Sequence, residues 1–228
     1  MHDAVNSILA VVAHPDDEVL GCGGYLAKRS RMGDAISVLC ISDGVSSRSE
    51  IDVEDNVRIR RDSARRAGDT LGIGAYYFGE YDDNRLDGVD LLDIAKYIEK
   101  ISRIARPNLV LTHFQGDLNI DHSRVSQATI TAFRPVPDSQ VKRILFFETP
   151  SSTEWNFSRT GNTFSPNWFE DISEDLETKI SALSEYSLEL REFPHPRSFQ
   201  SIRALASLRG ATCGFESAEA FVLGYNIA

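Results

Sequence analysis

The sequence of 228 residues has few cysteines, more negative than positive charge, and no long apolar run. Its three cysteines are an odd number without metal-motif spacing, which argues against a disulfide framework and fits a reducing cytoplasm; they are Cys22, Cys40 and Cys213. The 24 Lys and Arg against 34 Asp and Glu give a net charge of −10, which repels phosphate backbones, so we expect no nucleic-acid partner. The apolar stretch Ile8–Ala13 is too short to span a bilayer and lacks the features of a signal peptide, so we expect no membrane insertion and a cytoplasmic location.

Short apolar runs alternate with segments of helical period over the first two thirds of the chain. This alternation is typical of βαβ units and predicts an α/β fold, with a Rossmann-like, mainly parallel sheet and helices on both faces. The predicted strands are Ile8–His14, Ile36–Ser42, Ala75–Glu80, Leu109–Phe114, Ile144–Thr149 and, late in the chain, Phe221–Leu223. The predicted helices lie near Val19–Met32, Asn56–Leu71, Leu91–Ala105, Asp121–Phe133, Asp175–Leu190 and Phe199–Leu208.

The length and even composition predict one domain over residues 1–228, because the chain has no repeat or composition shift that marks a second one. We expect the C-terminal helices, from about residue 173, to pack back onto the sheet. The stretch Pro150–Pro166 is rich in Ser, Thr, Asn and Gly and predicts a long surface loop. Loops of that length are usually functional or mobile.

Polar side chains follow the first and fourth predicted strands, where each strand ends. The first strand runs directly into His14, Asp16, Asp17 and Glu18, and the fourth ends shortly before His122. Ligands of open α/β sheets bind beyond the carboxyl ends of the strands. Carboxylates crowded in one turn repel one another unless a cation relieves the charge, and His, Asp and a third protein ligand leave the open position of a catalytic zinc site. The sequence therefore predicts a metal site, which His122 can complete.

Two neighbouring carboxylates in the first turn, Asp16 and Asp17, cannot readily both bind one ion. We expect one to bind the metal and the other to take a proton from metal-bound water, whose pKa zinc lowers to about 7. The alternative is that residues 14–18 only cap the following helix, because carboxylates favour a helix N-terminus. A cap needs one short polar residue and does not explain the second acidic, imidazole-bearing turn at the neighbouring strand end.

The motif Ala13-His14-Pro15-Asp16-Asp17-Glu18, with Asp121-His122 much later, resembles the LmbE/PIG-L deacetylases. The resemblance extends over nearly the whole chain and includes residues 78–87 and 193–198. It implies a Rossmann-like, LmbE-like fold with zinc at the strand ends. It also implies the family's chemistry, which removes an acetyl group from the nitrogen of an amino sugar or its conjugate and yields acetate and a free amine.

Carried over residue by residue, the family pattern makes His14, Asp17 and His122 the metal ligands and Asp16 the general base. These roles agree with the interpretation of the two turns above. Two histidines and one carboxylate also describe a non-haem iron site, so Fe²⁺ is an alternative to Zn²⁺.

The family pattern is broken at Asn119, where many members carry a histidine that stabilises the oxyanion. An Asn amide can donate a hydrogen bond to an oxyanion but cannot deliver a proton. We therefore expect a catalytic hydrogen bond from Asn119, with His113 as a substitute if its loop folds back. Asp121 is expected to fix His122, since metal-bound imidazoles commonly donate their other N–H to a carboxylate.

Further polar residues near the predicted strand ends are candidates for substrate binding. One arginine of the helix near 56–71 would suit a phosphate or carboxylate if it reached the pocket, although a solvated helix face explains the same residues. The polar residues after the third strand suit sugar hydroxyls but also fit a simple polar turn. Glu154 in the long loop and His195 between two prolines could likewise bind substrate or only shape their loops. The candidates are Arg61, Asp83, Asn84, Arg85, His113, Glu154 and His195.

Together these patterns predict a zinc N-deacetylase for a small N-acetylated sugar or sugar conjugate, and they leave a homo-oligomer open. The first alternative keeps metal-dependent hydrolysis but acts on an amide in a thiol conjugate or a natural-product scaffold. The second is a non-catalytic Rossmann-like binding protein that uses the acidic turn for structure or metal storage. Acetate release from N-acetyl amines separates the enzyme from the binding protein.

Overall fold

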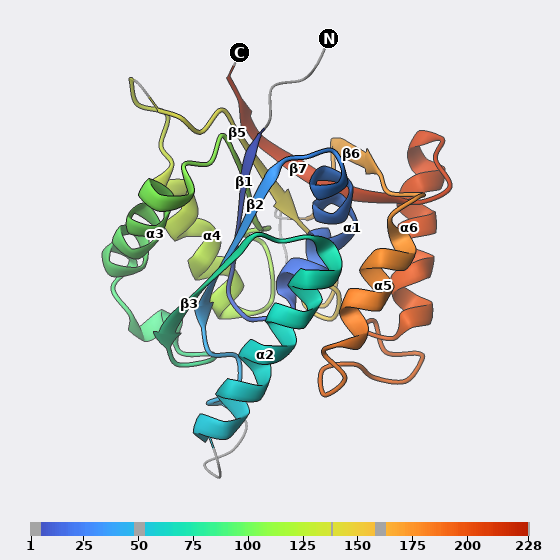
Figure 1. Ribbon diagram of the computed structural model, residues 1–228, viewed down its shortest axis with the longest axis horizontal. Helices are drawn as coiled ribbons and strands as arrows, with labels where there is room; N and C mark the ends of the chain where they lie inside the picture. The colour runs from blue at the N-terminus through green and yellow to red at the C-terminus, as the bar shows by residue number, and fades with distance from the viewer. Residues whose placement is uncertain (1–5, 48–52, 138, 158–162, 228) are drawn as a thin grey trace.

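A computed structural model describes residues 6–47, 53–137, 139–157 and 163–227, which build an α/β fold around one seven-stranded sheet (Figure 1). The order across the sheet is β3-β2-β1-β4-β5-β7-β6. Strands β1 to β5 are parallel, whereas β7 runs antiparallel to both of its neighbours. The bounds are β1 (Ser7–Val12), β2 (Ala35–Ser42), β3 (Ala75–Tyr81), β4 (Leu109–His113), β5 (Arg143–Phe147), β6 (Trp168–Asp171) and β7 (Ala218–Asn226). This arrangement confirms the predicted mainly parallel sheet.

Helices cover both faces of the sheet (Figure 1). One face carries α3 (Leu91–Ala105) and α4 (Ile120–Ala132), with the short 3-10 helix η1 (Leu86–Gly88) beside them. The other carries α1 (Asp17–Arg31), α2 (Val53–Leu71), α5 (Leu176–Ser184) and α6 (Phe199–Cys213). Helix α6 packs on β7 and β6, whereas α5 packs mainly on α1 and α2. Among the helices in the described part of the chain, none is long and apolar enough to cross a membrane.

Alternate residues of β1 divide the core into two layers. Ile8, Ala10 and Val12 belong to the cluster under α1, and Leu9 and Val11 belong to the cluster under α3 and α4. All five are fully buried. A strand covered on both faces is apolar at every position, which explains why β1 reads as one continuous apolar run.

Three elements near the C-terminus differ from the prediction. Strand β6 was not predicted, because its residues are half-buried at the sheet edge and show no apolar alternation. Strand β7 is longer than Phe221–Leu223. Helix α5 ends at Ser184, and the apolar period that continues to Leu190 is carried by turns, in which the Glu189 amide donates to the Tyr186 carbonyl at 2.8 Å.

The stretch predicted as a surface loop begins with a buried turn. The amides of Ser152 and Thr153 donate to the Thr149 carbonyl at 3.2 and 2.9 Å, and both residues are buried. Their hydroxyls donate to the carboxylate of Asp117, so the prediction of a surface loop is wrong for this turn. Residues 158–162 of the same stretch lie outside the described residues.

The sheet reverses its winding direction between β1 and β4. From β1 the chain builds β2 and β3 on one side and β4 and β5 on the other, and Val11 of β1 pairs with Thr112 of β4. The carboxyl ends of such neighbouring strands frame a crevice, the usual ligand site of doubly wound sheets. The two polar turns identified in the sequence therefore face each other at this switch point.

Candidate metal and active site

The turn after β1 has a strained backbone at Asp16. This residue has a φ of 133°, in the region that favours glycine, at a cost of about 1–3 kcal/mol. The Asp16 amide donates to Glu18 Oε2 at 3.0 Å, while the hydroxyls of Tyr186 and Tyr76 donate to Glu18 Oε1 at 2.5 and 3.2 Å. Glu18 is fully buried, and this burial raises its pKa to about 7. A buried carboxyl thus holds the turn in its strained form.

Three donor atoms converge beside this turn: Nδ1 of His14, Oδ2 of Asp17 and Nε2 of His122. The imidazole of His14 lies 3.1 Å from the carboxylate, and Nε2 of His122 lies 3.3 Å from each of the other two atoms. Ligands with bonds of about 2.0–2.1 Å at tetrahedral angles lie about 3.3–3.4 Å apart, which matches this spacing. All three residues are buried, and they form a group able to hold a metal ion.

The charge distribution in this group also favours a cation. Burial opposes ionisation of Asp17, but the neighbouring His122 holds the pKa of this carboxyl well below its usual range. Burial likewise opposes protonation of His122, but Asp17 and Asp117 raise its pKa to about 9. Among the described residues, Oδ1 of Asp17 is buried with no hydrogen-bond partner. A metal ion is the kind of partner that such an atom lacks.

A carboxylate other than the predicted one lies beside His122. Nδ1 of His122 lies 3.2 Å from Oδ1 of Asp117, whereas Oδ2 of Asp121 lies 3.2 Å from Nε2 of His14. Successive residues of a helix point about 100° apart, so Asp121 cannot face the same way as His122. The prediction that Asp121 fixes His122 is therefore wrong: Asp121 orients His14. Asp117 is a residue that sequence reasoning missed, because nothing in its spacing from His122 marks it as the partner of that ring.

Asp83 and Asp121 together surround the outer nitrogen of His14. Nε2 of His14 lies 3.0 Å from Oδ1 of Asp83, so these three residues form a second group with metal-ligand character. We favour the first group, because the Asp121 carboxylate already accepts the amides of Asn84 and Leu86 at 2.8 and 3.0 Å. Asp83 is only 3% exposed, so the structure places it behind His14 instead of on a sugar-binding surface.

Asp16 lies between two guanidinium groups. Its Oδ2 is 3.1 Å from Nη2 of Arg60 and 3.0 Å from Nη1 of Arg197, and Arg60 also pairs with Glu189. Asp16 is only 1% exposed, and burial raises its pKa while the two arginines oppose that shift. Sequence reasoning missed Glu189 and Arg197, because both approach from the far end of the chain.

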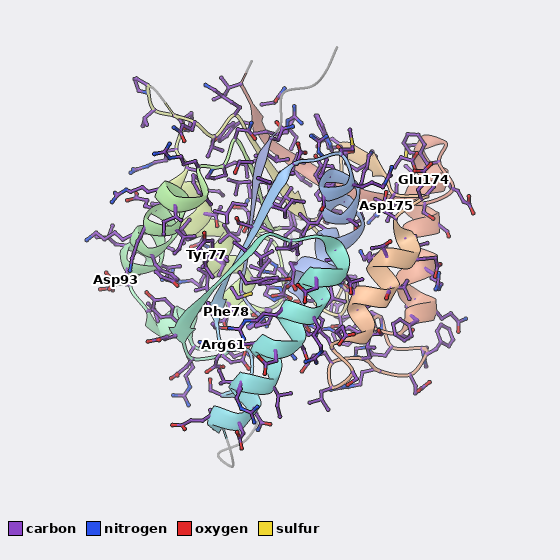
Figure 2. The ribbon with its side chains drawn as sticks, viewed as in Figure 1. Arg61, Tyr77, Phe78, Asp93, Glu174 and Asp175 are labelled. Atoms are coloured by element: carbon purple, nitrogen blue, oxygen red, sulfur yellow. The ribbon has the colours of Figure 1, made fainter. Side chains whose placement is uncertain are left out.

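The arginine that reaches the site from α2 is Arg60 and not the predicted Arg61. Nη2 of Arg61 donates to the Gly79 carbonyl at 3.0 Å, and its guanidinium lies over the Phe78 ring at 5.3 Å (Figure 2). Arg61 points away from the site because one step along a helix turns a side chain by about 100°, as with Asp121 and His122 on α4.

Asn119 caps α4. Its Oδ1 accepts the amides of Asp121 and His122 at 2.8 and 3.4 Å, and its Nδ2 donates to Oδ1 of Asn84 at 3.2 Å. This side chain therefore positions the helix turn that carries two site residues. The structure assigns it a capping role in place of the predicted hydrogen bond to an oxyanion.

His113 lies behind the metal-binding group and does not face substrate. Its ring is fully buried and stacks on His122 with centroids 3.9 Å apart. Nε2 accepts the Ala13 amide at 2.9 Å, so Nδ1 carries the proton and lies 3.2 Å from Oγ1 of Thr149. Burial and His122 lower the pKa of His113 to about 4. The prediction that His113 contacts substrate or an oxyanion is wrong, because both ring nitrogens are engaged.

The remaining candidates lie around the rim. Asn84 and Arg85 are exposed next to η1. Glu154 accepts the Ser151 amide at 2.6 Å and so shapes its own loop. The His195 ring packs edge-on against Trp155 at 5.4 Å. The structure brings these residues near the loops of the site, without a contact that assigns them to substrate.

A cavity of about 420 Å³ is lined in part by Arg60, the α2 arginine that contacts Asp16. It lies between α2 and the turns after α5, and Arg60 and Glu189 form the wall next to Asp16. Ile59, Tyr186 and Leu188 supply apolar surface on other sides. Arg60 and Glu189 are thus the residues through which this cavity connects to Asp16, which does not line it itself.

Two histidines and an aspartate at the switch point of a Rossmann-like sheet define an α/β protein with a candidate metal centre at its strand ends. Residues 9–133 match the family described as PIG-L: GlcNAc-PI de-N-acetylase. An uncharacterized deacetylase of Escherichia coli K12, YaiS, is 31% identical over 185 residues, which cover 78% of this chain and 89% of that protein. The chain belongs to the PIG-L family, which confirms the resemblance seen in the motifs.

Other relatives extend the comparison. Diacetylchitobiose deacetylase of Thermococcus kodakarensis is 24% identical, with 94% of this chain and 82% of that protein covered. The solved structure of N,N'-diacetylchitobiose deacetylase from Pyrococcus horikoshii shares the fold, with a TM-score of 0.77, 22% identity and coverage of 95% and 82%. 4-Oxalmesaconate hydratase of Pseudomonas putida is 31% identical over 135 residues, which cover 54% of this chain and 49% of that protein.

Proposed function

We propose that this protein is a zinc-dependent N-deacetylase that hydrolyses the acetamide of an amino sugar or sugar conjugate and releases acetate. The observation that carries the proposal is the convergence of His14, Asp17 and His122 beside the strained, buried Asp16. Membership of the PIG-L family and the deacetylases among its relatives support this chemistry.

His14, Asp17 and His122 are the residues that would hold the metal. When bound, zinc polarises a carbonyl oxygen and lowers the pKa of bound water to about 7. Asp117 and Asp121 orient the two imidazoles, each through the ring nitrogen that faces away from the shared carboxylate of Asp17. The same set of ligands suits Fe²⁺, so metal analysis of the purified protein decides between the two ions.

Asp16 is proposed to carry the proton. It takes one proton from water as the water oxygen bonds to the acetyl carbon, and it returns that proton to the amide nitrogen as the C–N bond breaks. The products are acetate and the free amine. Arg60 and Arg197 favour the anionic form of this buried carboxyl, which a general base requires.

The cavity beside Asp16 is proposed to take the rest of the substrate. Its volume of about 420 Å³ lies within the range of small-molecule sites, and its apolar walls suit a sugar conjugate that carries an apolar group. We place the reaction in the cytoplasm, where free thiols stay reduced; this fits the three unpaired cysteines Cys22, Cys40 and Cys213.

The test is acetate release by the zinc-loaded protein from a panel of N-acetyl sugars, conjugates and larger amides. Asp16→Ala should abolish turnover with zinc still bound, and His122→Ala should lose zinc. Asp93→Ala, on the exposed end of α3, is the matched control and should keep both (Figure 2). Turnover of the larger amides alone would favour the amidase on a thiol conjugate or natural-product scaffold. A zinc-loaded protein that releases acetate from none of them refutes the proposal and leaves a binding protein or the hydratase considered next.

A second candidate is a metal-dependent hydratase, because one relative is named 4-oxalmesaconate hydratase. Such a substrate carries several carboxylates, which unpaired arginines would bind. Arg60 and Arg197 are instead paired with Asp16 and Glu189, which favours a neutral amide. Loss of the ultraviolet absorbance of an unsaturated dicarboxylate, without acetate release, would identify the hydratase.

A further inference from the structure

Arg197 reaches Asp16 from a segment 181 residues away in the chain. Its Nη1 donates to Oδ2 of Asp16 at 3.0 Å, and its Nε donates to the Ser151 hydroxyl at 2.7 Å. The side chain is 18% exposed, against 6% for that of Arg60. Arg197 is therefore the more accessible of the two guanidinium groups on Asp16.

The backbone around Arg197 is firmly held. The Arg197 amide donates to Nδ1 of His195 at 3.1 Å, and the Ser198 amide donates to the His195 carbonyl at 2.9 Å. Ser198 then caps α6, since its hydroxyl accepts the Ser201 amide at 3.1 Å. A side chain that starts from such a turn loses little further freedom when it binds a carboxylate.

The charges around Asp16 balance one another. Asp16 and Glu189 carry two negative charges, and Arg60 and Arg197 carry two positive ones. Arg60 divides its guanidinium between both carboxylates, whereas the nearest approach of Arg197 to Glu189 is 3.9 Å. Of these two carboxyl groups Arg197 makes its close contact with Asp16, and its loss would remove one of the two guanidinium groups on Asp16.

Both guanidinium contacts fall on the same oxygen of Asp16. Within the described residues, Arg60 and Arg197 each contact Oδ2. Such a clamp fixes the position of Oδ2, and neither contact involves Oδ1. Proton transfer is sensitive to the position of the carboxylate, because donor and acceptor must lie within hydrogen-bond reach.

We propose that Arg197 is a positioning residue for proton transfer by Asp16, and that Ser151 orients Arg197. The inference rests on the proposed function. It also gives a role to the loop after β5, because Ser151 adopts a φ of 67° and its amide donates to Glu154 at 2.6 Å. The loop thus sets the position of the general base through one arginine.

The test compares kcat, KM, zinc content and melting temperature of the zinc-loaded wild type, Arg197→Ala and Arg197→Lys. Arg197→Ala should lower kcat by roughly 10²-fold, with KM and zinc content nearly unchanged, because proton transfer by a positioned group contributes about 10²–10⁴-fold. Arg197→Lys should recover part of the loss. Added guanidinium should restore Arg197→Ala but not Arg197→Lys. Arg203→Ala, which removes an exposed arginine of α6, is the control and should keep wild-type kcat.

A double-mutant cycle tests the part of Ser151. Ser151→Ala should lower kcat by several-fold in the wild type and have no effect when Arg197 is already Ala. Equal kcat in the wild type and Arg197→Ala overturns the role of Arg197 but not the proposed function. A loss of kcat in proportion to a loss of zinc or of melting temperature does the same. A zinc-loaded wild type that releases no acetate refutes the proposed function, and the inference with it.

Discussion

Replacing Asp117 by Asn tests whether this residue holds His122. Oδ1 of Asp117 lies 3.2 Å from Nδ1 of His122 and accepts the Asn119 amide at 2.9 Å, and Oδ2 accepts the Thr153 hydroxyl at 2.7 Å. The Asn side chain keeps the shape and one acceptor oxygen, but it loses the charge that favours a positively polarised imidazole.

The Asp117→Asn substitution should change two quantities, the affinity for zinc and the free energy of unfolding. Loss of a carboxylate behind a metal-bound imidazole costs 10–100-fold in metal affinity, or about 1.4–2.7 kcal/mol. The new amide N–H₂ faces Thr153, whose Oγ1 already accepts the Thr149 amide at 2.7 Å, so one hydroxyl proton loses its acceptor. That loss should lower the free energy of unfolding by about 1 kcal/mol.

The assay is competition for zinc against a chelating dye, with urea unfolding of the apoprotein measured in parallel. Asp121→Asn should weaken zinc binding through His14 by a comparable factor, and Asp93→Asn should leave it unchanged. If Asp117→Asn binds zinc as tightly as the wild type does, the assignment of Asp117 to His122 is wrong.

Three further predictions follow from contacts elsewhere in the structure. Asn119→Ala should lower the free energy of unfolding by about 1 kcal/mol, because α4 loses its cap, and should lower kcat less than 10-fold. A 10²-fold loss of kcat at full zinc occupancy would instead support a hydrogen bond from Asn119 to the oxyanion. Lys179→Met should lower the free energy of unfolding in urea by about 3–5 kcal/mol, because the buried Glu219 carboxylate loses its ion-pair partner at 2.6 Å. The double mutant with Glu219→Gln should recover part of that loss, and additive losses would contradict the pairing. Dialysis against a chelator should remove metal and acetate release together, and one equivalent of Zn²⁺ should restore both; activity that survives in metal-free protein would contradict the metal assignment.

The sequence allowed most of the sheet and the centre of the site to be predicted. The first strands are apolar along their whole length because helices cover both faces, so their positions were evident without tertiary information. His14, Asp17 and His122 follow strands whose carboxyl ends meet at the switch point, and the structure places them together. Strand β6 was missed because an edge strand of half-buried residues carries no period.

The partners of these residues could not be predicted, since they depend on orientation and long-range approach. On α2 and α4 a difference of one residue, about 100° of rotation, decided that Arg60 and not Arg61 meets Asp16 and that Asp121 serves His14 and not His122. Glu189 and Arg197 enter the site from the C-terminal third.

The sequence by itself determined which chemistry the strand ends carry, because local apolar runs and a contiguous acidic turn are encoded within a few residues. Only the tertiary structure decided which charges surround Asp16 and which carboxylate supports each imidazole. Asp16 with Arg197 and His14 with Asp121 are more than a hundred positions apart and meet only when the packed layers bring the loops together. Asp117 is close to His122 in the sequence, but the fold of the turn decides that this carboxylate faces the ring.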